Sequence, residues 1–302
     1  MKEILKITAS LTAVCIAAAL ILGAVFAKTE HIRKENEEKM QEETIRSLLG
    51  YGAGKQVPSD LKVFPVYRYV LQDAKGATLL GYVLPMKDKG FAMVEIDLTG
   101  KPGKVIPVKA EAALLAEAAT RDAAVKAAVP QGTKAIYTQT LFVANLGSER
   151  LGYVIPGVTK GFKTFIKLME ALNREYTVKD IAILESEEDP GLGDEIKKDY
   201  FKNQFEGKTE EVLKGLDVVK QPLPPEYLDV LEPAKAKKLG FSPEKIREIK
   251  DAHLKDNIYA ITGATISSRA VTNGVKDTVR KFVYRLAALD KAIKQEKIEV
   301  AF

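Results

Sequence analysis

Residues 261–268 form a short run of small and hydroxyl-bearing side chains, Ile-Thr-Gly-Ala-Thr-Ile-Ser-Ser, directly before an amphipathic segment. Thr265 lies where a helix would begin, and there unpaired backbone N–H groups and the helix dipole favour an anion. Gly263 and Ala264 would let the backbone come close to that anion. The run therefore predicts a phosphate site, with the phosphate bound loosely or esterified to Thr265.

The helix itself is predicted from apolar residues at three- and four-residue steps, the period of one buried helix face. They are Val271, Val275, Val279, Phe282, Val283 and Leu286. A Gly-Ala-Thr tripeptide alone is equally consistent with an ordinary helix cap, since it arises by chance in about a tenth of chains of this length.

A second motif lies upstream, where residues 188–193 read Glu-Asp-Pro-Gly-Leu-Gly. Pro and Gly are common in loops, so this segment alone indicates only a turn. The two motifs in this order, behind one N-terminal hydrophobic span, are much more specific than either alone.

Together they resemble the flavin-binding subunits of membrane redox complexes, namely the G subunit of the Rnf complex and the C subunit of the sodium-translocating NADH:quinone reductase. In that family a Ser/Thr-Gly-Ala-Thr motif carries FMN, which a flavin transferase links by a phosphoester to the last threonine, here Thr265. The family's Glu-Thr-Pro-Gly-Leu-Gly loop is matched from Glu188 to Gly193. The resemblance covers roughly Leu151 to Arg285, and the N-terminal span extends it.

The resemblance implies a cofactor site made of two segments. The loop would supply Glu188 and Asp189, with Leu192 and Gly193 lining the flavin ring, and no catalytic or metal-ligating residue is expected. The turn would supply the phosphate-binding residues Thr262, Gly263, Ala264, Thr265, Ser267 and Ser268.

Two positions depart from the family pattern. Tyr259 stands where the transferase motif has an aspartate, with Asp256 the nearest acid, and Asp189 replaces the loop threonine. A carboxylate at position 189 would make a nearby flavin harder to reduce, because negative charge disfavours the addition of electrons.

Composition limits the other cofactors. The 302-residue chain is 46% hydrophobic with a net charge of +5 and interspersed Lys and Glu, so it requires neither nucleic acid nor an anionic surface as partner. Its one cysteine, Cys15, excludes an internal disulfide and a Cys-ligated iron–sulfur cluster. We expect His31 and His253 to be solvated helix residues rather than zinc or haem ligands.

Residues Ile7 to Ala27 are 21 uncharged positions, enough for a helix to cross a bilayer. The competing interpretation is a signal peptide cleaved after Val25-Phe26-Ala27; the length favours a retained anchor. Lys and Arg counts around the span point weakly to a cytoplasmic main domain. The resemblance instead implies a single-pass protein of the inner membrane with its soluble domain on the outer face.

The sequence predicts an α+β protein in four parts: a transmembrane anchor (1–28), a charged helical stalk and linker (29–60), and two related β-sheet lobes with packed helices. The lobes are expected because residues 80–85, Leu-Gly-Tyr-Val-Leu-Pro, recur as residues 151–156, Leu-Gly-Tyr-Val-Ile-Pro. The first lobe (61–147) would be a degenerate copy without the flavin motif, containing an Ala-rich helix over residues 110–129. The second (148–302) would be the FMN-binding domain, with an insertion at about 210–255.

Within the insertion we expect an extended, Pro-rich segment over residues 216–233 and a helix that Ser242 caps and that runs to about Leu254.

The resemblance also implies a function. The chain would be an electron-relay subunit of a membrane-bound, ion-translocating oxidoreductase of the Rnf type (ferredoxin:NAD), with other subunits and the transferase as partners and no catalysis by this chain alone. The alternatives are a structural or assembly subunit that has lost covalent flavin and, less favoured, a membrane-anchored sensor.

Overall fold

A computed structural model describes residues 2–302 apart from 53, 74, 75 and 89, and it excludes the side chains of Ala27, His31 and Lys34. The expectations for His31 and for a cleavage site at Ala27 therefore concern side chains outside the described part. The chain divides into two compact units, residues 1–47 and 48–302.

The first unit consists almost entirely of one helix, α1 (Lys2–Leu48). Its apolar part has a mean hydropathy of 2.4 over an 18-residue window, and its large apolar side chains there are exposed. Farther along, Arg33 pairs with Glu30 at 2.7 Å and also with Glu37, as is typical of a solvated helix face. The predicted apolar helix is thus present, with the length and composition of a bilayer span.

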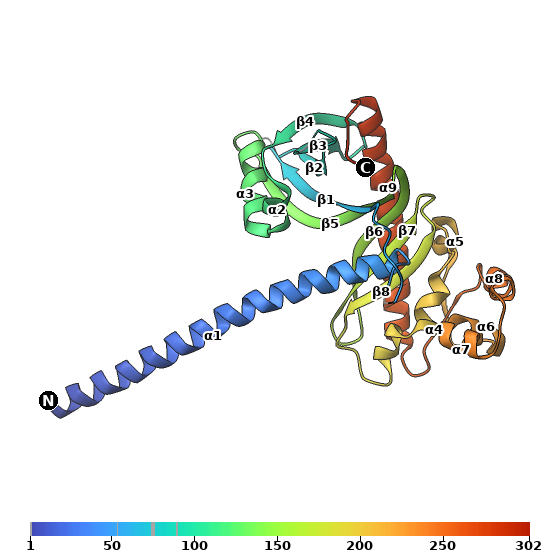
Figure 1. Cartoon of the computed structure of the whole chain (residues 1–302), viewed down its shortest axis with the longest axis horizontal. Coiled ribbons are helices and arrows are strands. Elements are labelled where there is room, and N and C mark those ends of the chain that lie inside the picture. The colour runs from blue at the N-terminus through green and yellow to red at the C-terminus, as the bar shows by residue number, and fades with distance from the viewer. Residues whose placement is uncertain (1, 53, 74–75, 89) are drawn as a thin grey trace. The chain divides into compact units, whose positions relative to one another are not determined.

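The second unit contains one antiparallel eight-stranded sheet in the order β4-β3-β2-β1-β5-β6-β7-β8 (Figure 1). The strands are β1 (Leu61–Gln72), β2 (Thr78–Pro85), β3 (Phe91–Asp97), β4 (Pro102–Val108), β5 (Lys134–Leu146), β6 (Glu149–Lys160), β7 (Phe165–Asn173) and β8 (Val178–Glu185). The order is symmetric about the β1–β5 pair, and the repeated hexapeptides occupy β2 and β6, the strands next to that pair. The two strand groups are therefore halves of one sheet.

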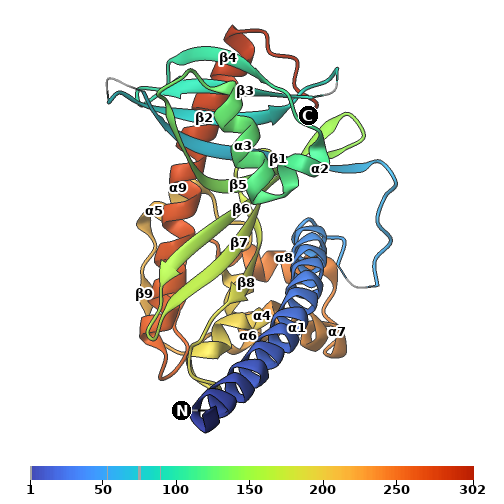
Figure 2. The same ribbon diagram turned by 90° about the vertical axis from the view of Figure 1, so that its left-hand side faces the viewer.

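The long helix α9 (Thr265–Gln295) runs along one face of this sheet and contacts β6, β3 and β4 (Figure 2). Its predicted apolar stripe is confirmed, because Val271, Val275, Val279 and Phe282 are buried in the main core cluster. This stripe fixes the rotation of α9, and so it also fixes which residues of its first turn face outward.

The other face of the first half-sheet is covered by α2 (Ala112–Ala116) and α3 (Ala118–Ala128). The prediction of a single Ala-rich helix is wrong, because Glu117 adopts an extended conformation and separates α2 from α3. With this break, Leu115 and Val125 are both fully buried in the same apolar cluster.

After β8 the chain forms short elements: η1 (Gly193–Lys197), α4 (Asp199–Lys202), η2 (Asn203–Phe205), α5 (Glu210–Gly215), β9 (Val218–Val219), α6 (Pro225–Leu231), α7 (Pro233–Lys238), α8 (Pro243–Ala252) and β10 (Ile258–Tyr259). The prediction of an extended segment over residues 216–233 is wrong where α6 forms. Pro225 occupies the first turn of α6, and Tyr227, Val230 and Leu231 share one buried face with Ile249 of α8.

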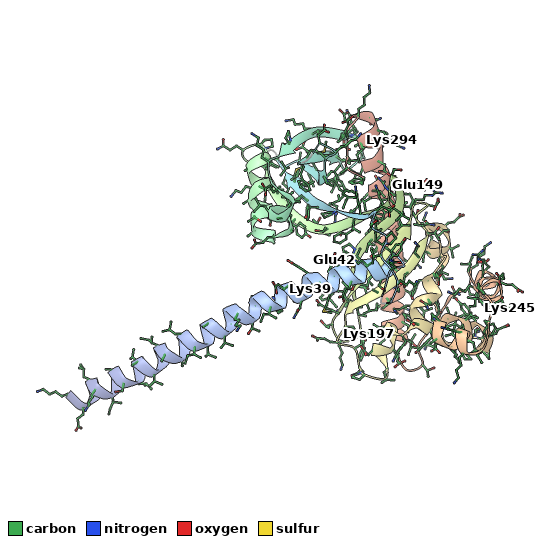
Figure 3. All side chains as sticks on the ribbon, in the orientation of Figure 1. Lys39, Glu42, Glu149, Lys197, Lys245 and Lys294 are labelled. Carbon is green, nitrogen blue, oxygen red and sulfur yellow. The ribbon has the colours of Figure 1, made fainter. Side chains whose placement is uncertain are left out.

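Helix α8 is predicted correctly, with the Ser242 hydroxyl accepting a hydrogen bond from the Lys245 N–H at 3.2 Å. Its other end is held by Lys208, whose buried ammonium donates to the carbonyls of Leu254 at 2.6 Å and Asp256 at 3.1 Å. At the outer edge of the insertion, the side chain of Lys245 on α8 is partly exposed (Figure 3) and pairs with Glu248 at 3.3 Å. The fold class is α+β, as predicted.

Candidate functional site

The first turn of α9 presents free backbone donors. The helix begins at Thr265, and among the described residues no side chain caps it. The first backbone N–H of this turn with a carbonyl partner is that of Ser268, which donates to Ala264 at 3.0 Å. The N–H groups of the residues before it point out of the helix end, where the dipole favours an anion.

The turn before α9 requires its glycine. Gly263 has φ of +80°, a left-handed conformation, and a Cβ added there would lie 3.0 Å from Cδ2 of Leu192. Thr262 and Gly263 are exposed, Ala264 is buried, and Thr265 is partly exposed. The two sequence motifs therefore lie against each other at Gly263 and Leu192, and Thr265, two residues after Gly263, is partly accessible.

Ser267 and Ser268 have hydroxyls that are engaged within the protein. Ser268 Oγ accepts from the Ile261 N–H at 3.0 Å and donates to the Ala264 carbonyl at 2.9 Å. Ser267 Oγ donates to Glu188 Oε2. Both serines are at most 2% exposed, so they hold the turn in shape.

Glu188 connects three segments of the chain. Its Oε1 accepts hydrogen bonds from the backbone N–H groups of Phe162 at 2.9 Å and Lys163 at 3.2 Å, and its Oε2 accepts from Ser267. A Cβ on Gly193 would lie 2.8 Å from Glu188 Cβ and 2.9 Å from Ser267 Oγ, so only glycine fits there. The loop over residues 188–193 is thereby fixed against both α9 and the β6–β7 turn.

Asp189 forms an ion pair with Lys163, and this proximity to the carboxylate raises the pKa of the Lys163 ammonium. The lysine offsets the negative charge that the sequence places in this loop. Nearby, large apolar side chains are unusually exposed: Phe162, Leu192 and Ile266 have 58%, 47% and 58% of their surface accessible. Exposed apolar groups of this kind suit the face of a planar ring.

A groove beside Thr265 is rimmed by cations. Its volume is about 410 Å³. Its lining includes Lys160 of β6, Lys220 after β9, and both Ile266 and Arg269 of α9. The only ion pair of these cations within the described residues is a long one, 3.9 Å from Arg269 to Asp217. Free donors and positive charge thus converge beside the Thr265 hydroxyl, as a phosphate requires.

Sequence reasoning missed these three cations. Arg269 could have been found, because it follows Thr265 by four residues and so shares its helix face. Lys160 and Lys220 lie 105 and 45 positions before Thr265 (265 − 160; 265 − 220), and only the tertiary fold brings them to the groove.

The two departures from the family pattern differ in their surroundings, since Asp189 pairs with Lys163 whereas Tyr259 belongs to a second polar cluster. The Tyr259 hydroxyl donates to Asp256 Oδ2 at 3.1 Å, and His253 Nδ1 lies 2.7 Å from the same oxygen. His253 also stacks on Tyr227, with ring centroids 4.1 Å apart. The expectation that His253 is a solvated helix residue is therefore wrong: it ends α8 and packs between Tyr227 and Asp256.

Parts of the chain are similar to known proteins. Residues 161–280, which run from the β6–β7 turn into α9, match the FMN-binding domain family. The chain is 31% identical over 140 residues to the G subunit of the proton-translocating ferredoxin:NAD(+) oxidoreductase complex of Clostridium ljungdahlii, over 46% of this chain and 58% of that protein. It is 27% identical over 143 residues to the G subunit of the Na(+)-translocating complex of Acetobacterium woodii, over 47% and 54%.

The chain thus spans little more than half the length of these relatives, to which it is homologous. Similar solved structures include NqrC of Shewanella oneidensis (17% identity, TM-score 0.41, 80% of this chain and 91% of that one). Another is the C subunit of the Na(+)-translocating NADH-quinone reductase of Parabacteroides distasonis (18% identity, TM-score 0.43, 84% and 95%). The family resemblance drawn from the two motifs is confirmed.

Proposed function

We propose that this chain carries FMN as a phosphoester on Thr265 and relays electrons as a subunit of a membrane-bound, ion-translocating ferredoxin:NAD oxidoreductase. The observation that carries the proposal is the partly exposed Thr265 at an uncapped helix start, in the wall of a groove that Lys160, Lys220 and Arg269 also line. The FMN-binding domain match over residues 161–280 and the homology to G subunits support it.

The residues divide into three roles in this proposal. The free N–H groups of α9 and the three groove cations hold the phosphate, while Gly263 keeps side-chain atoms away from it. Leu192, Ile266 and Phe162 offer apolar surface to the ring. Bound FMN would accept and release electrons singly or in pairs. Ser267, Ser268 and Glu188 keep the two motifs in register without touching the cofactor.

The covalent link can be tested on the full chain coexpressed with a flavin transferase, by flavin fluorescence in a denaturing gel. We expect a fluorescent band from the wild type and none from Thr265→Ala. Thr99→Ala, at an exposed threonine outside both motifs, is the control and should stay fluorescent. A fluorescent band from Thr265→Ala would show that the flavin is attached to a different residue.

The alternative function is a structural or assembly subunit without covalent flavin. Tyr259, at the position where the transferase motif has an aspartate, is the observation that favours it. A wild-type band without fluorescence, from a chain that still assembles with other subunits, would support this alternative over the electron relay.

We also propose that α1 anchors the protein in the inner membrane with the sheet domain on the outer face. Cys15 is the only cysteine, so the variant Cys15→Ser/Arg247→Cys carries one thiol on the exposed surface of α8. A membrane-impermeant maleimide should label it in intact spheroplasts. Labelling only after the membrane is permeabilised would show that the sheet domain lies on the cytoplasmic face instead.

A further inference from the structure

A second cavity lies under α9, away from the Thr265 groove. It measures about 250 Å³ and is formed by strands of both half-sheets together with α9. Thr278 on its wall is 13 residues after Thr265, about 20 Å along the helix at a rise of 1.5 Å per residue. Its polar lining consists of Arg68, Tyr82, Gln139, Thr278, Lys281 and Arg285.

Three of these residues form a row across neighbouring strands. Arg68 on β1 lies directly opposite Tyr82 on β2 and Gln139 on β5. The register of β1 and β5 shifts immediately after Arg68, and the Thr138 hydroxyl bonds the Arg68 carbonyl at 2.8 Å. Such irregularities often aim a side chain at a functional site.

The row contains buried polar atoms without a partner in the described structure. Tyr82 is 1% exposed and its hydroxyl has no hydrogen bond; Arg68 is 8% exposed and its Nε has none. Within the described part of the chain, the one hydrogen bond of the Arg68 side chain, to Gln139 Oε1, is long at 3.4 Å. Buried donors normally have partners, and each one left unsatisfied costs free energy.

The wall opposite the row adds two more cations. Thr278, Lys281 and Arg285 follow each other at steps of three and four residues, so they share one face of α9. Burial, and then the charge of Arg285, lowers the pKa of the Arg68 guanidinium. The two arginines therefore repel each other across the cavity.

Little negative charge balances these groups. The only carboxylate paired with a lining cation among the described residues is Asp277, which is 54% exposed and 3.5 Å from Lys281. Glu170 lies beside Thr278, but burial raises the pKa of its carboxyl well above the ordinary value and so favours the uncharged form. A buried arginine close to a second arginine without an acid is the arrangement expected when an anion completes the site.

We propose that this cavity binds a small oxyanion, a molecule bearing carboxylate or phosphate groups. Arg68 and Arg285 would donate to its oxygens, the Tyr82 hydroxyl would gain the acceptor that it lacks, and Lys281 would add charge at the mouth. The volume is below the range usual for drug-sized ligands, which favours a compact anion over a nucleotide. Because its donors come from β1, β2 and α9, the bound anion would tie the first half-sheet to the helix that carries Thr265.

The test uses the full chain in detergent, titrated with inorganic phosphate or citrate while chloride keeps the ionic strength constant. Thermal unfolding and calorimetry follow binding, since a ligand of the folded state raises the unfolding temperature with concentration. Saturable binding of either anion supports the site, and the tighter of the two identifies phosphate or carboxylate as the preferred group. Stabilisation no greater than that by chloride would overturn the proposal.

Variants then locate the site. Arg285→Gln, at a partly exposed position, should weaken binding about tenfold or more, and Tyr82→Phe, which keeps the ring, should weaken it severalfold. Arg280→Gln is the matched control, because Arg280 is an exposed arginine of α9 outside the cavity and is paired with Asp277. It should stay within twofold of the wild type, whereas equal losses in Arg280→Gln and Arg285→Gln would show nonspecific attraction. Flavin fluorescence of the same samples reports on Thr265 separately, so the two proposals fail independently.

Discussion

Ser267, in the first turn of α9, donates its hydroxyl to the carboxylate of Glu188, a residue 79 positions earlier. Both groups are buried, at 2% and 4% exposure. The bond joins the Pro-Gly loop to the helix start, and Glu188 extends the connection to the β6–β7 turn through two backbone N–H groups. The shape of the Thr265 site therefore depends on one buried carboxylate that does not itself face the groove.

The first prediction concerns this carboxylate. Glu188→Ala should lower the free energy of unfolding by about 3 kcal/mol, because the buried Ser267 hydroxyl and the backbone N–H groups of Phe162 and Lys163 lose their common acceptor. Urea unfolding of the full chain in detergent, followed by circular dichroism, measures the change. Glu187→Ala removes the exposed neighbouring carboxylate and should stay within about 0.5 kcal/mol of the wild type. Equal effects of the two variants would contradict the role given to Glu188.

The second prediction concerns the charge balance of the loop. If the flavin lies by the 188–193 loop, Asp189→Asn should raise its reduction potential, by on the order of 20 mV, because a solvent-screened negative charge is lost. Lys163→Met should lower the potential, since it leaves the Asp189 carboxylate uncompensated. Potentiometric titration of the FMN-loaded chain gives both values.

Lys167→Met is the control for this pair of variants. Lys167 lies on β7 and pairs with Glu185 at 2.7 Å, so its loss should leave the potential unchanged if the flavin is at the loop. Shifts of the same sign in Asp189→Asn and Lys163→Met would rule out a flavin beside this pair.

The third prediction concerns pH and Lys208. Burial lowers the pKa of its ammonium from 10.5 to about 8, so the folded protein loses this proton at a lower pH than the unfolded chain does. Between about pH 8 and 10 the unfolded state binds more protons, and stability must therefore rise with pH. Below pH 8 both states are protonated and the cost of burying the charge is fully present.

The measurable quantity is the unfolding free energy of the wild type relative to Lys208→Met. We expect this difference to change in favour of the wild type by up to about 3 kcal/mol between pH 7 and 10, from 1.36 kcal/mol per pKa unit. Lys245→Met, at a partly exposed lysine of α8, should show no such slope. A difference that is flat with pH, or that falls, would mean that Lys208 keeps its ordinary pKa in the folded protein.

Local patterns in the sequence predicted local structure well. The stripe from Val271 to Leu286 predicted α9, and Ser242-Pro243 predicted the start of α8, because helix periodicity and capping are encoded within a few residues. The need for glycine at position 263 was likewise visible in the motif. Pro-rich composition misled at α6, where Pro225 begins a helix instead of preventing one.

Contacts between distant residues could not be read in the same way. Nothing in the sequence near Glu188 indicates that its partners are Phe162 and Ser267. The serine hydroxyls that we expected to face a phosphate are bonded within the protein, Ser267 to Glu188 and Ser268 to the Ala264 carbonyl. Arg68 and Gln139 meet only because β1 pairs with β5 across 71 positions. The Arg68–Gln139 contact depends on strand register, which one sequence does not specify when several pairings bury similar apolar faces.

The measurement that tests the central claim most directly is peptide mapping of the chain after coexpression with a flavin transferase. Cleavage after Lys255 and Arg269 releases residues 256–269, a single peptide that contains Thr262, Thr265, Ser267 and Ser268. We predict that tandem mass spectrometry finds the added mass of FMN less water only on fragments that include Thr265. An FMN adduct on one of the other three hydroxyls, or a peptide without any adduct, would contradict the assignment of Thr265 as the attachment site.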